Sequence, residues 1–156
     1  MCGIAGLLAP RSGDADGITA TLQKMTRSLA HRGPDAEGFW REGEVALGHR
    51  RLTILDLSDA GAQPMRSESG RYIIVFNGEI YNHAELRVEL QAKGVEFNTS
   101  HSDTEVLLNG LILEGKEFLQ KINGMFAFCF ADLREDYFLF ARDRLGIKPF
   151  YYSIIN

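Results

Sequence analysis

The sequence predicts an α+β fold in which helices cover packed β-sheets. Its 156 residues fit one domain, which can bury roughly 70 % of the surface that the unfolded chain exposes. Segments with the apolar spacing of helices are grouped apart from runs of short apolar segments that are typical of strands. The last of these short segments are apolar on both faces, which indicates sheets that are buried on both sides.

In the first half of the chain, the pattern predicts a strand, a helix and a hairpin. Residues 3–8 form a short apolar run that suits a buried strand, so the polypeptide begins inside the core. Apolar side chains three and four residues apart then predict a helix over 16–29. A hairpin with strands at 39–40 and 45–47 follows, and then an apolar segment over 51–57. The apolar face of the helix comprises Ile18, Leu22, Met25 and Leu29.

The second half predicts a buried strand, two helices and a run of strands. The strand covers 72–76, and Asn77-Gly78 closes it. A helix is predicted over 83–93, and another begins at Asp103, which is a plausible N-cap. Three apolar segments that follow are predicted strands, over 125–130, 137–140 and 149–152.

Charge and composition exclude several classes of protein. The 17 Lys and Arg residues against 21 Asp and Glu residues give a formal net charge of −4, which argues against a nucleic-acid partner. The apolar run at the start is far shorter than the roughly 20 residues of a membrane helix, and no secretory signal is recognisable, so we expect no membrane partner. The two cysteines, Cys2 and Cys129, lie at opposite ends of the chain and suggest no disulfide framework, so we expect a cytoplasmic protein.

Several local patterns suggest sites but are better explained structurally. The sequence from Gly110 to Lys116 resembles a phosphate-binding loop, but Glu117 stands where that loop has Ser or Thr, and the intervening apolar residues fit a helix. The four histidines have no partners at metal-ligand spacing, so no metal site is predicted. Asp56 and Asp59 fit turns, and Cys129 fits a buried core position.

The start of the chain is more informative. Cys2 follows the initiator Met1, which is usually removed before a small side chain, and the mature chain then carries a thiol and a free α-amine on one residue. An α-amine has a pKa of about 7.7 to 8.0, so it can accept a proton near neutral pH. Cys2 is therefore a candidate nucleophile with its own base. The alternative is an ordinary second residue, but it directly precedes a predicted buried strand.

Polar residues elsewhere can complete such a site. A nucleophile that forms a thioester needs donors for the developing oxyanion, and Asn77-Gly78 offers a side-chain amide and an approachable backbone N–H. The alternative is a plain turn, for which Asn-Gly is common. Glu79 follows and can orient a polar substrate or begin a helix. An amino-acid substrate also needs a cation for its carboxylate, from Arg50 or Arg51, and an anion such as Asp103 for its ammonium. Each of these charged residues could equally lie at the surface or cap a helix.

Seven blocks in order carry a resemblance that covers almost the whole chain. They are Met1-Cys2-Gly3-Ile4, His31-Arg32-Gly33-Pro34-Asp35, Gly48-His49-Arg50-Arg51-Leu52, Phe76-Asn77-Gly78-Glu79-Ile80-Tyr81-Asn82, Ser102-Asp103-Thr104-Glu105, Gly124-Met125-Phe126-Ala127-Phe128 and Arg142-Asp143-Arg144-Leu145-Gly146. Together they resemble the glutaminase domain of class II glutamine amidotransferases, and specifically that of glutamine-hydrolysing asparagine synthetases. The resemblance implies the N-terminal-nucleophile hydrolase fold, a four-layer αββα sandwich of two antiparallel sheets.

The resemblance also implies a role for each site residue. Cys2, once Met1 is removed, would attack the side-chain amide of L-glutamine while its α-amine moves the proton; ammonia would leave, and water would resolve the glutamyl thioester. Asn77 and Gly78 would form the oxyanion hole. Arg51, rather than Arg50, would hold the substrate carboxylate. The other implied pocket residues are Leu52, Thr53, Ile54, Leu55, Glu79 and Asp103, of which Asp103 would bind the substrate amino group.

The ammonia acceptor is not implied by these residues. Family members continue into an ATP-dependent synthetase domain with a Ser-Gly-Gly-x-Asp-Ser loop, which this sequence lacks. We therefore expect a glutaminase domain over 1–156 that is C-terminally incomplete, with no cofactor of its own; ATP and Mg would belong only to the absent synthetase domain. A fragment, a short protein that serves a separate ammonia-accepting enzyme, and a remnant are all compatible with this ending. The acceptor would be aspartate or another group such as a sugar carboxylate, and a non-catalytic glutamine-binding module is the alternative from another class.

Overall fold

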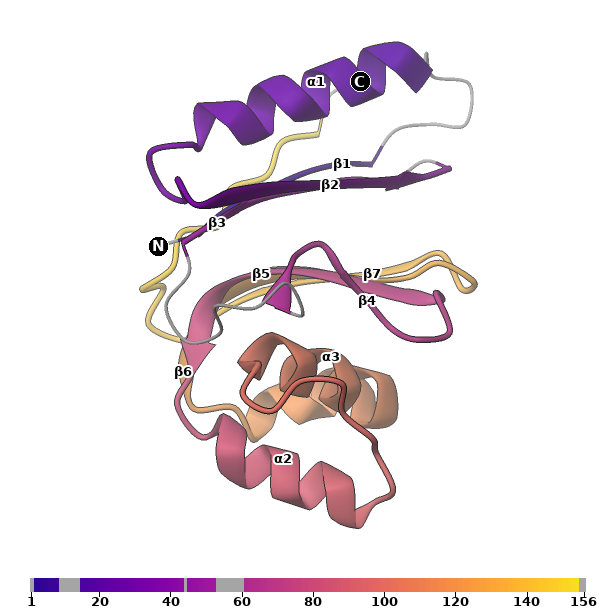
Figure 1. Ribbon diagram of the computed structural model, residues 1–156, viewed down its shortest axis with the longest axis vertical. Helices are drawn as coiled ribbons and strands as arrows, with labels where there is room; N and C mark the ends of the chain where they lie inside the picture. Colours follow the sequence, from indigo (N-terminus) through magenta and orange to yellow (C-terminus); the bar gives the residue numbers. More distant parts are fainter. Residues whose placement is uncertain (1, 9–14, 44, 53–60, 155–156) are drawn as a thin grey trace.

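The computed structural model has four layers, with two antiparallel sheets packed face to face and helices on both outer faces (Figure 1). This arrangement confirms the predicted αββα sandwich. The structure describes residues 2–8, 15–43, 45–52 and 61–154.

The first sheet, called sheet A here, holds the N-terminal strand in its edge position. Its strand order is β1-β3-β2, with every pair antiparallel. Helix α1 covers its outer face, and a Cβ at Gly48 would lie 2.0 Å from the Thr26 hydroxyl, so the helix packs directly against the middle strand. The elements are β1 (Gly3–Leu8), α1 (Ala15–Ser28), β2 (Ala36–Glu42) and β3 (Val45–Arg51).

The second sheet, sheet B, is four-stranded with the order β4-β5-β6-β7. Its central pair runs in register from Tyr72 opposite Asp132 to Ile80 opposite Gly124. The helices α2 and α3 cover its outer face (Figure 1). The elements are β4 (Met65–Arg66), β5 (Tyr72–Ile80), α2 (His83–Ala92), α3 (Asp103–Glu114), the 3-10 helix η2 (Gly115–Gln120), β6 (Gly124–Asp132) and β7 (Tyr137–Arg142).

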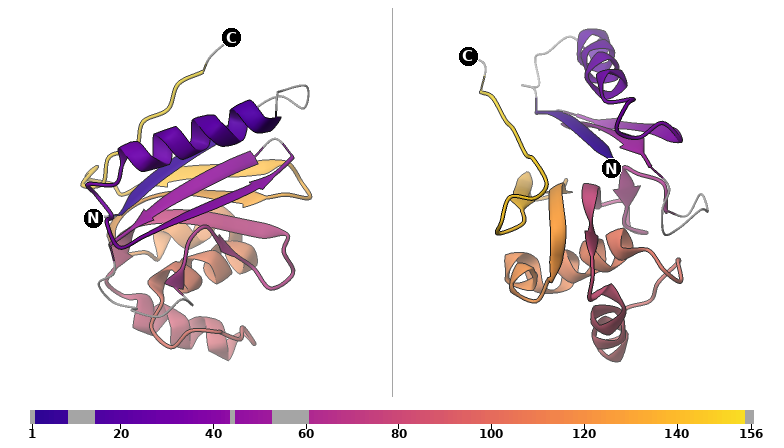
Figure 2. Two further views of the ribbon diagram at one scale, coloured as in Figure 1. Left: turned by 45° about the horizontal axis from the view of Figure 1, so that its top comes forward. Right: turned by 90° about the vertical axis from the view of Figure 1, so that its left-hand side faces the viewer.

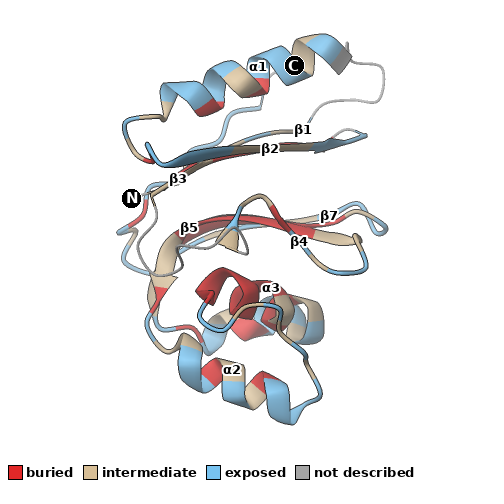
Figure 3. Ribbon diagram, in the orientation of Figure 1, coloured by how far each residue is buried: buried red, intermediate tan, exposed pale blue. Residues whose placement is uncertain are grey.

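Strand β5 separates two hydrophobic cores, as its buried ribbon in Figure 3 indicates. Because successive side chains of a strand point to opposite faces, its residues divide by parity. Ile73 and Val75 pack in the core between the sheets, which also contains Cys129, as predicted for that thiol. Ile74 and Phe76 pack in the core beneath α2 and α3. The parity of β5 therefore determines which of its later residues face sheet A.

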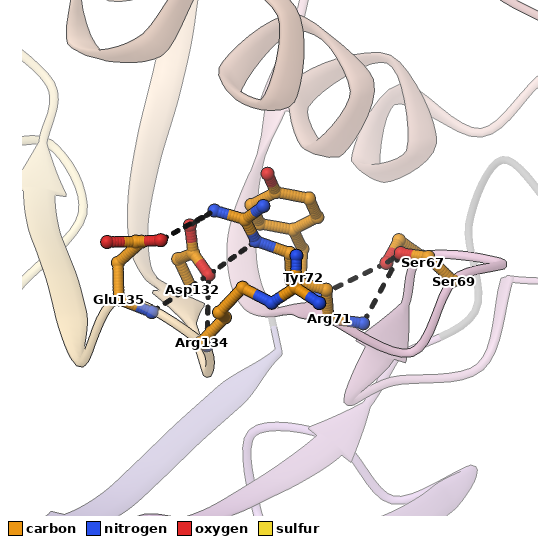
Figure 4. A network of polar contacts seen from close by, with 7 residues as sticks. All are labelled: Ser67, Ser69, Arg71, Tyr72, Asp132, Arg134 and Glu135. Atoms are coloured by element: carbon orange, nitrogen blue, oxygen red, sulfur yellow. Dashed lines mark hydrogen bonds and ion pairs between the residues drawn. The ribbon is translucent and has the colours of Figure 1, made fainter.

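A polar network stabilises the end of sheet B that is remote from the N-terminus (Figure 4). The Arg71 guanidinium donates to both carboxylate oxygens of Asp132, at 2.8 and 2.6 Å, and lies 4.9 Å from the centre of the Tyr72 ring. The same carboxylate accepts from the backbone N–H of Arg134 and Glu135 in the β6–β7 turn. The Arg71 hydrogen bond lowers the pKa of Asp132, so the network ties the start of β5 to this turn while the carboxylate is ionised.

The structure confirms most of the expected elements but corrects three details. Strand β5 does not close at Asn77-Gly78 but continues to Ile80, because Asn77 and Gly78 pair with Ala127 and Phe126 of β6. The plain-turn interpretation of Asn77-Gly78 is therefore wrong. Helix α3 is capped by Ser102, whose hydroxyl accepts from Glu105 N–H, and Asp103 is its first residue rather than its cap.

The third correction concerns the segment 149–152, which is not a strand. After β7 the chain turns around Asp143, whose carboxylate accepts from the N–H groups of Phe126, Ile147 and Lys148. The segment then leaves sheet B and runs toward the level of α1 (Figure 2). Tyr151 is 91 % exposed, so the apolar pattern of 149–152 is not matched by burial in the structure.

Candidate active site

Cys2 lies where sheet A ends, beside the residues that follow β3. Gly3 is in register with Arg50, which places Cys2 next to Arg51 and Leu52. The Leu52 N–H donates to the Cys2 Sγ at 3.4 Å, and the Sγ lies 3.7 Å from the Leu52 carbonyl oxygen. The thiol belongs to a half-buried residue, in contrast to the buried Cys129, whose pKa burial raises to about 12. Cys2 is thus the accessible thiol of the two.

The two arginines at the end of β3 point to opposite faces of sheet A. Arg50 donates to the Gly33 carbonyl and to the Glu37 carboxylate, each at 2.9 Å, so its guanidinium is engaged by β2 and the turn before it. Arg51 shares the other face with His49, which reaches sheet B by donating to the Phe76 carbonyl at 3.2 Å. Arg51 therefore faces the space between the sheets, as the assignment of the substrate carboxylate to Arg51 requires.

The turn over 31–35, one of the seven blocks of the resemblance, lies beside Cys2 and the end of β3. A Cβ at Gly33 would lie 2.4 Å from the Arg50 carbonyl, so this turn lies directly against the end of β3. Arg32 donates through Nε to the Cys2 carbonyl at 3.1 Å, and its buried Nη2 has no hydrogen-bond partner among the described residues. The sequence alone did not indicate this contact of Arg32 with Cys2, because only the three-dimensional path of 31–35 brings the two residues together.

Strand β5 ends on the side of the molecule where the N-terminus lies (Figure 1), and its last residues include the expected oxyanion residues Asn77 and Gly78. By the parity of β5, Asn77 and Glu79 point toward sheet A. Asn77 is 3 % exposed, and its Oδ1 has no hydrogen-bond partner in the part of the chain that the structure describes. A Cβ at Gly78 would lie 2.3 Å from the Met125 carbonyl oxygen, so that position requires glycine. A buried amide oxygen without a partner is costly for folding, which indicates a role other than packing.

Asp103 approaches the same end of β5 from the helical side. Its Oδ2 accepts from the Ile80 N–H at 3.0 Å, and the residue is 9 % exposed. Burial raises the pKa of the Asp103 carboxyl, which the Ile80 hydrogen bond partly opposes. A substrate ammonium beside this carboxylate would supply the positive charge that favours its ionised form.

His49 is neutral at physiological pH. Burial lowers the pKa of its imidazole from 6.5 to about 4, and the positive charge of Arg51 adds to this effect, while the bond to Phe76 opposes it. A carbonyl oxygen only accepts hydrogen bonds, so the His49 Nε2 carries the proton. The imidazole thus serves as a neutral donor between the two sheets.

This titration predicts a pH dependence of stability. Above about pH 6.5, His49 is neutral in both the folded and the unfolded chain. Between pH 6.5 and 4 only the unfolded chain takes the proton, so the free energy of unfolding should fall by about 3 kcal/mol across this window. In urea unfolding at a series of pH values, His49→Gln should remove this part of the slope, and the exposed His101→Gln should keep it. Equal slopes for both variants would contradict the prediction.

Other predicted residues are not brought into this constellation. Leu52 contacts Cys2, but Thr53, Ile54 and Leu55 lie outside the described residues, as do Asp56 and Asp59. The segment that resembles a phosphate-binding loop begins inside a helix, because Gly110 belongs to α3. A Cβ at Gly110 would lie 2.2 Å from the Phe118 ring, so this glycine serves close packing. Over the described ranges there is no group of three or more His, Cys, Asp or Glu side chains that could hold a metal, and no helix long and apolar enough to cross a membrane.

Known proteins resemble this chain in sequence and in fold. The model of the glutamine amidotransferase domain family matches residues 1–156. The chain is 44 % identical, over all of its length, to asparagine synthetase [glutamine-hydrolyzing] 1 of Bacillus subtilis, and it covers 24 % of that protein. It is 40 % identical, over 97 % of its length, to asparagine synthetase B [glutamine-hydrolyzing] of Escherichia coli, and it covers 26 % of that protein. The chain thus spans about a quarter of the length of these relatives.

Among solved structures, the fold is similar to that of the glutamine phosphoribosylpyrophosphate amidotransferase from B. subtilis. The TM-score is 0.66 at 22 % identity, over 83 % of this chain and 35 % of that one. This similarity confirms the N-terminal-nucleophile hydrolase fold that the sequence resemblance implied.

Proposed function

Because this chain belongs to the glutamine amidotransferase domain family, we propose that it hydrolyses L-glutamine to L-glutamate and ammonia through a thioester on Cys2. The observation that carries the proposal is the placement of Cys2 and Asn77. Cys2 directly precedes β1 of sheet A, and Asn77 lies on the face of β5 that is directed toward sheet A. The N-terminus and the end of β5 lie on the same side of the molecule (Figure 1). A substrate amide between Cys2 and Asn77 would have a thiol on its carbonyl carbon and the Asn77 Nδ2 as a donor to its oxygen.

The reaction begins after removal of Met1. The α-amine of Cys2 takes the thiol proton, and the sulfur attacks the side-chain carbonyl carbon of glutamine to give a tetrahedral oxyanion. Asn77 and the Gly78 N–H stabilise this oxyanion. As the intermediate collapses, the C–N bond breaks, and the ammonium of Cys2 returns its proton to the departing ammonia. Water then attacks the thioester, gives a proton to the α-amine, and the C–S bond breaks to release glutamate and restore the thiol.

The remaining residues hold the substrate in place. Arg51 binds the α-carboxylate, because its guanidinium lies on the face of β3 that is directed toward sheet B. Asp103 binds the α-ammonium near the end of β5. Leu52, which contacts the Cys2 Sγ, and Glu79, which shares the face of β5 with Asn77, are the next residues we assign to substrate binding. Thr53, Ile54 and Leu55 are assigned to it by their motif alone.

The test is glutamate release from L-glutamine by the purified chain, with its intact mass measured to confirm loss of Met1. We expect release of glutamate and ammonia in equal amounts, without ATP and unaffected by EDTA, because the mechanism requires no cofactor. L-Asparagine, shorter by one methylene, should be a poor substrate. A folded, Met1-free protein that binds glutamine and releases no glutamate would overturn the proposal in favour of a binding module.

We further propose that the ammonia serves a synthetase that amidates aspartate. Both relatives at 44 % and 40 % identity are named asparagine synthetases, which favours aspartate over a sugar carboxylate. The partner would be a synthetase domain or a separate enzyme, and ATP and Mg²⁺ would act there.

Arg51→Ala should raise the KM for glutamine roughly 10- to 100-fold, because one charged hydrogen-bond partner of the carboxylate is lost. Arg50→Ala is the matched control, since the Arg50 guanidinium is engaged by Glu37 and Gly33. It should have the smaller effect on KM in steady-state glutaminase assays. A larger rise in KM for Arg50→Ala would contradict the assignment.

A further inference from the structure

The edge of β5 that faces β4 has no partner strand beyond Ile74, in the direction of Asn77 and Gly78. Strand β4 pairs Met65 with Ile74 and ends there in the direction of the site. Continuing this antiparallel register would bring Gln63 opposite Phe76. The ladder does not continue to this pair, because β4 consists of Met65 and Arg66 alone. The backbone of Phe76 therefore needs other hydrogen-bond partners.

Two side chains from different parts of the fold provide these partners. The Gln63 Oε1 accepts from the Phe76 N–H at 2.6 Å. The His49 Nε2, on β3 of sheet A, donates to the Phe76 carbonyl at 3.2 Å. Both polar groups of the residue directly before Asn77 are thus held by side chains, one of which comes from the sheet that carries Cys2.

The backbone N–H groups of β5 alternate in direction, which places the Gly78 N–H on the same edge of the strand as the Phe76 N–H. In an antiparallel pair, every second residue directs its N–H to the same edge, so the N–H groups of Phe76, Gly78 and Ile80 point the same way. Gln63 holds the first of these, and Asp103 holds the last at 3.0 Å. The Gly78 N–H lies between these two fixed positions.

Gln63 also connects strand β5 to helix α3. Its Nε2 donates to the Thr104 hydroxyl at 3.3 Å, one residue after Asp103 in the first turn of α3. One amide group therefore connects β5, through Phe76, to the helix that carries the proposed ammonium ligand. Displacement of Gln63 would move the oxyanion donors relative to the rest of the pocket.

We propose that Gln63 and His49 are positioning residues that hold the Asn77-Gly78 segment in place of the missing partner strand. This inference rests on the proposed glutaminase function. It assigns Gln63 a role in the chemical step and not in the binding of glutamine, because the oxyanion forms only during the reaction.

Gln63→Met keeps the length of the side chain and removes both hydrogen bonds. We expect kcat for glutamine to fall roughly 10- to 100-fold, since small displacements of catalytic groups have effects of this size. The dissociation constant of L-glutamine, measured by calorimetry in the Cys2→Ala background where no oxyanion forms, should change less than twofold. The exposed Gln91→Met on α2 is the matched control and should leave both quantities unchanged. Unchanged kcat in Gln63→Met, or weaker glutamine binding by the same factor, would overturn the proposal.

A second variant covers the case in which Gln63→Met does not fold. Thr104→Val removes only the link from Gln63 to α3 and should give a smaller loss of kcat, again with unchanged L-glutamine affinity in the Cys2→Ala background. A normal kcat in this variant would show that Gln63 is not held from α3 and would overturn that part of the proposal.

Amide hydrogen exchange separates this inference from the proposed function. The Phe76 N–H should exchange slowly in the wild-type chain and faster in Gln63→Met, and the side-chain amide resonances of Asn77 should shift. If the wild-type chain hydrolyses no glutamine, the proposed function fails, and this measurement still decides whether Gln63 holds the segment. Equal exchange of the Phe76 N–H in both proteins would overturn the positioning role.

Discussion

Cys2→Ala should abolish glutamate release from L-glutamine, with a loss of at least about 10⁴-fold in kcat, because the proposed mechanism forms the thioester on Cys2. The side chain is half-buried and accepts from the Leu52 N–H, so its removal should alter stability little. Glutamate release and the thermal unfolding midpoint, measured on the same preparation, check both statements. Residual activity near the wild-type level would remove Cys2 from the mechanism.

Cys129→Ala is the control for this experiment. Burial in the core between the sheets raises the pKa of the Cys129 thiol to about 12, so it remains protonated and inaccessible at working pH. The variant should keep its activity and lose stability through the cavity it creates. A variant with one residue inserted between Met1 and Cys2 would keep the thiol and lose the α-amine. It should be as inactive as Cys2→Ala, because an amide nitrogen cannot serve as the base.

The sequence predicts most of this architecture because the relevant signals are local. The apolar face of α1 is a periodic pattern, and the start of β5 and the run that forms β6 are continuous apolar runs; tertiary contacts did not override these local signals. At Asn77-Gly78 the local signal predicts the wrong structure. The pair is a strong local turn signal, but pairing with β6 over Asn77 to Ile80 keeps it inside a strand. Long-range pairing of this kind is not readable from a local pattern.

The candidate site likewise contains residues that the sequence alone could suggest and residues that only the fold brings together. Cys2, Arg51 and Asp103 could be proposed because thiols, guanidinium groups and carboxylates carry chemistry wherever they lie. Arg32 and Gln63 could not, because their importance depends on the path of the turn over 31–35 and on where β4 stops pairing. The choice of Arg51 over Arg50 came from the resemblance alone, and the structure adds a physical reason through the bonds from Arg50 to Glu37 and Gly33.

Asn77→Ala should lower kcat for glutamine about 10²- to 10³-fold, with a small change in KM, because the amide contacts the substrate oxygen mainly in the transition state. Asn77→Asp should be at least as impaired, since a carboxylate would repel the oxyanion. Steady-state kinetics of both variants test this. Asn98→Ala, at an exposed position on the far side of sheet B, is the control and should behave as wild type. A large rise in KM with unchanged kcat would assign Asn77 to substrate binding instead.

The stability of Asn77→Ala distinguishes a functional amide from a structural one. A structural asparagine would be hydrogen-bonded, and its loss would destabilise the fold by about 1 to 3 kcal/mol. The Asn77 Oδ1 is buried without a hydrogen-bond partner among the described residues, so the folded chain already bears the cost of its desolvation. Removal of the amide should therefore leave the free energy of unfolding unchanged or higher, while activity is lost. Urea unfolding of the same variant measures this. Opposite effects on stability and activity are expected where a protein keeps an unfavourable buried group for its chemistry.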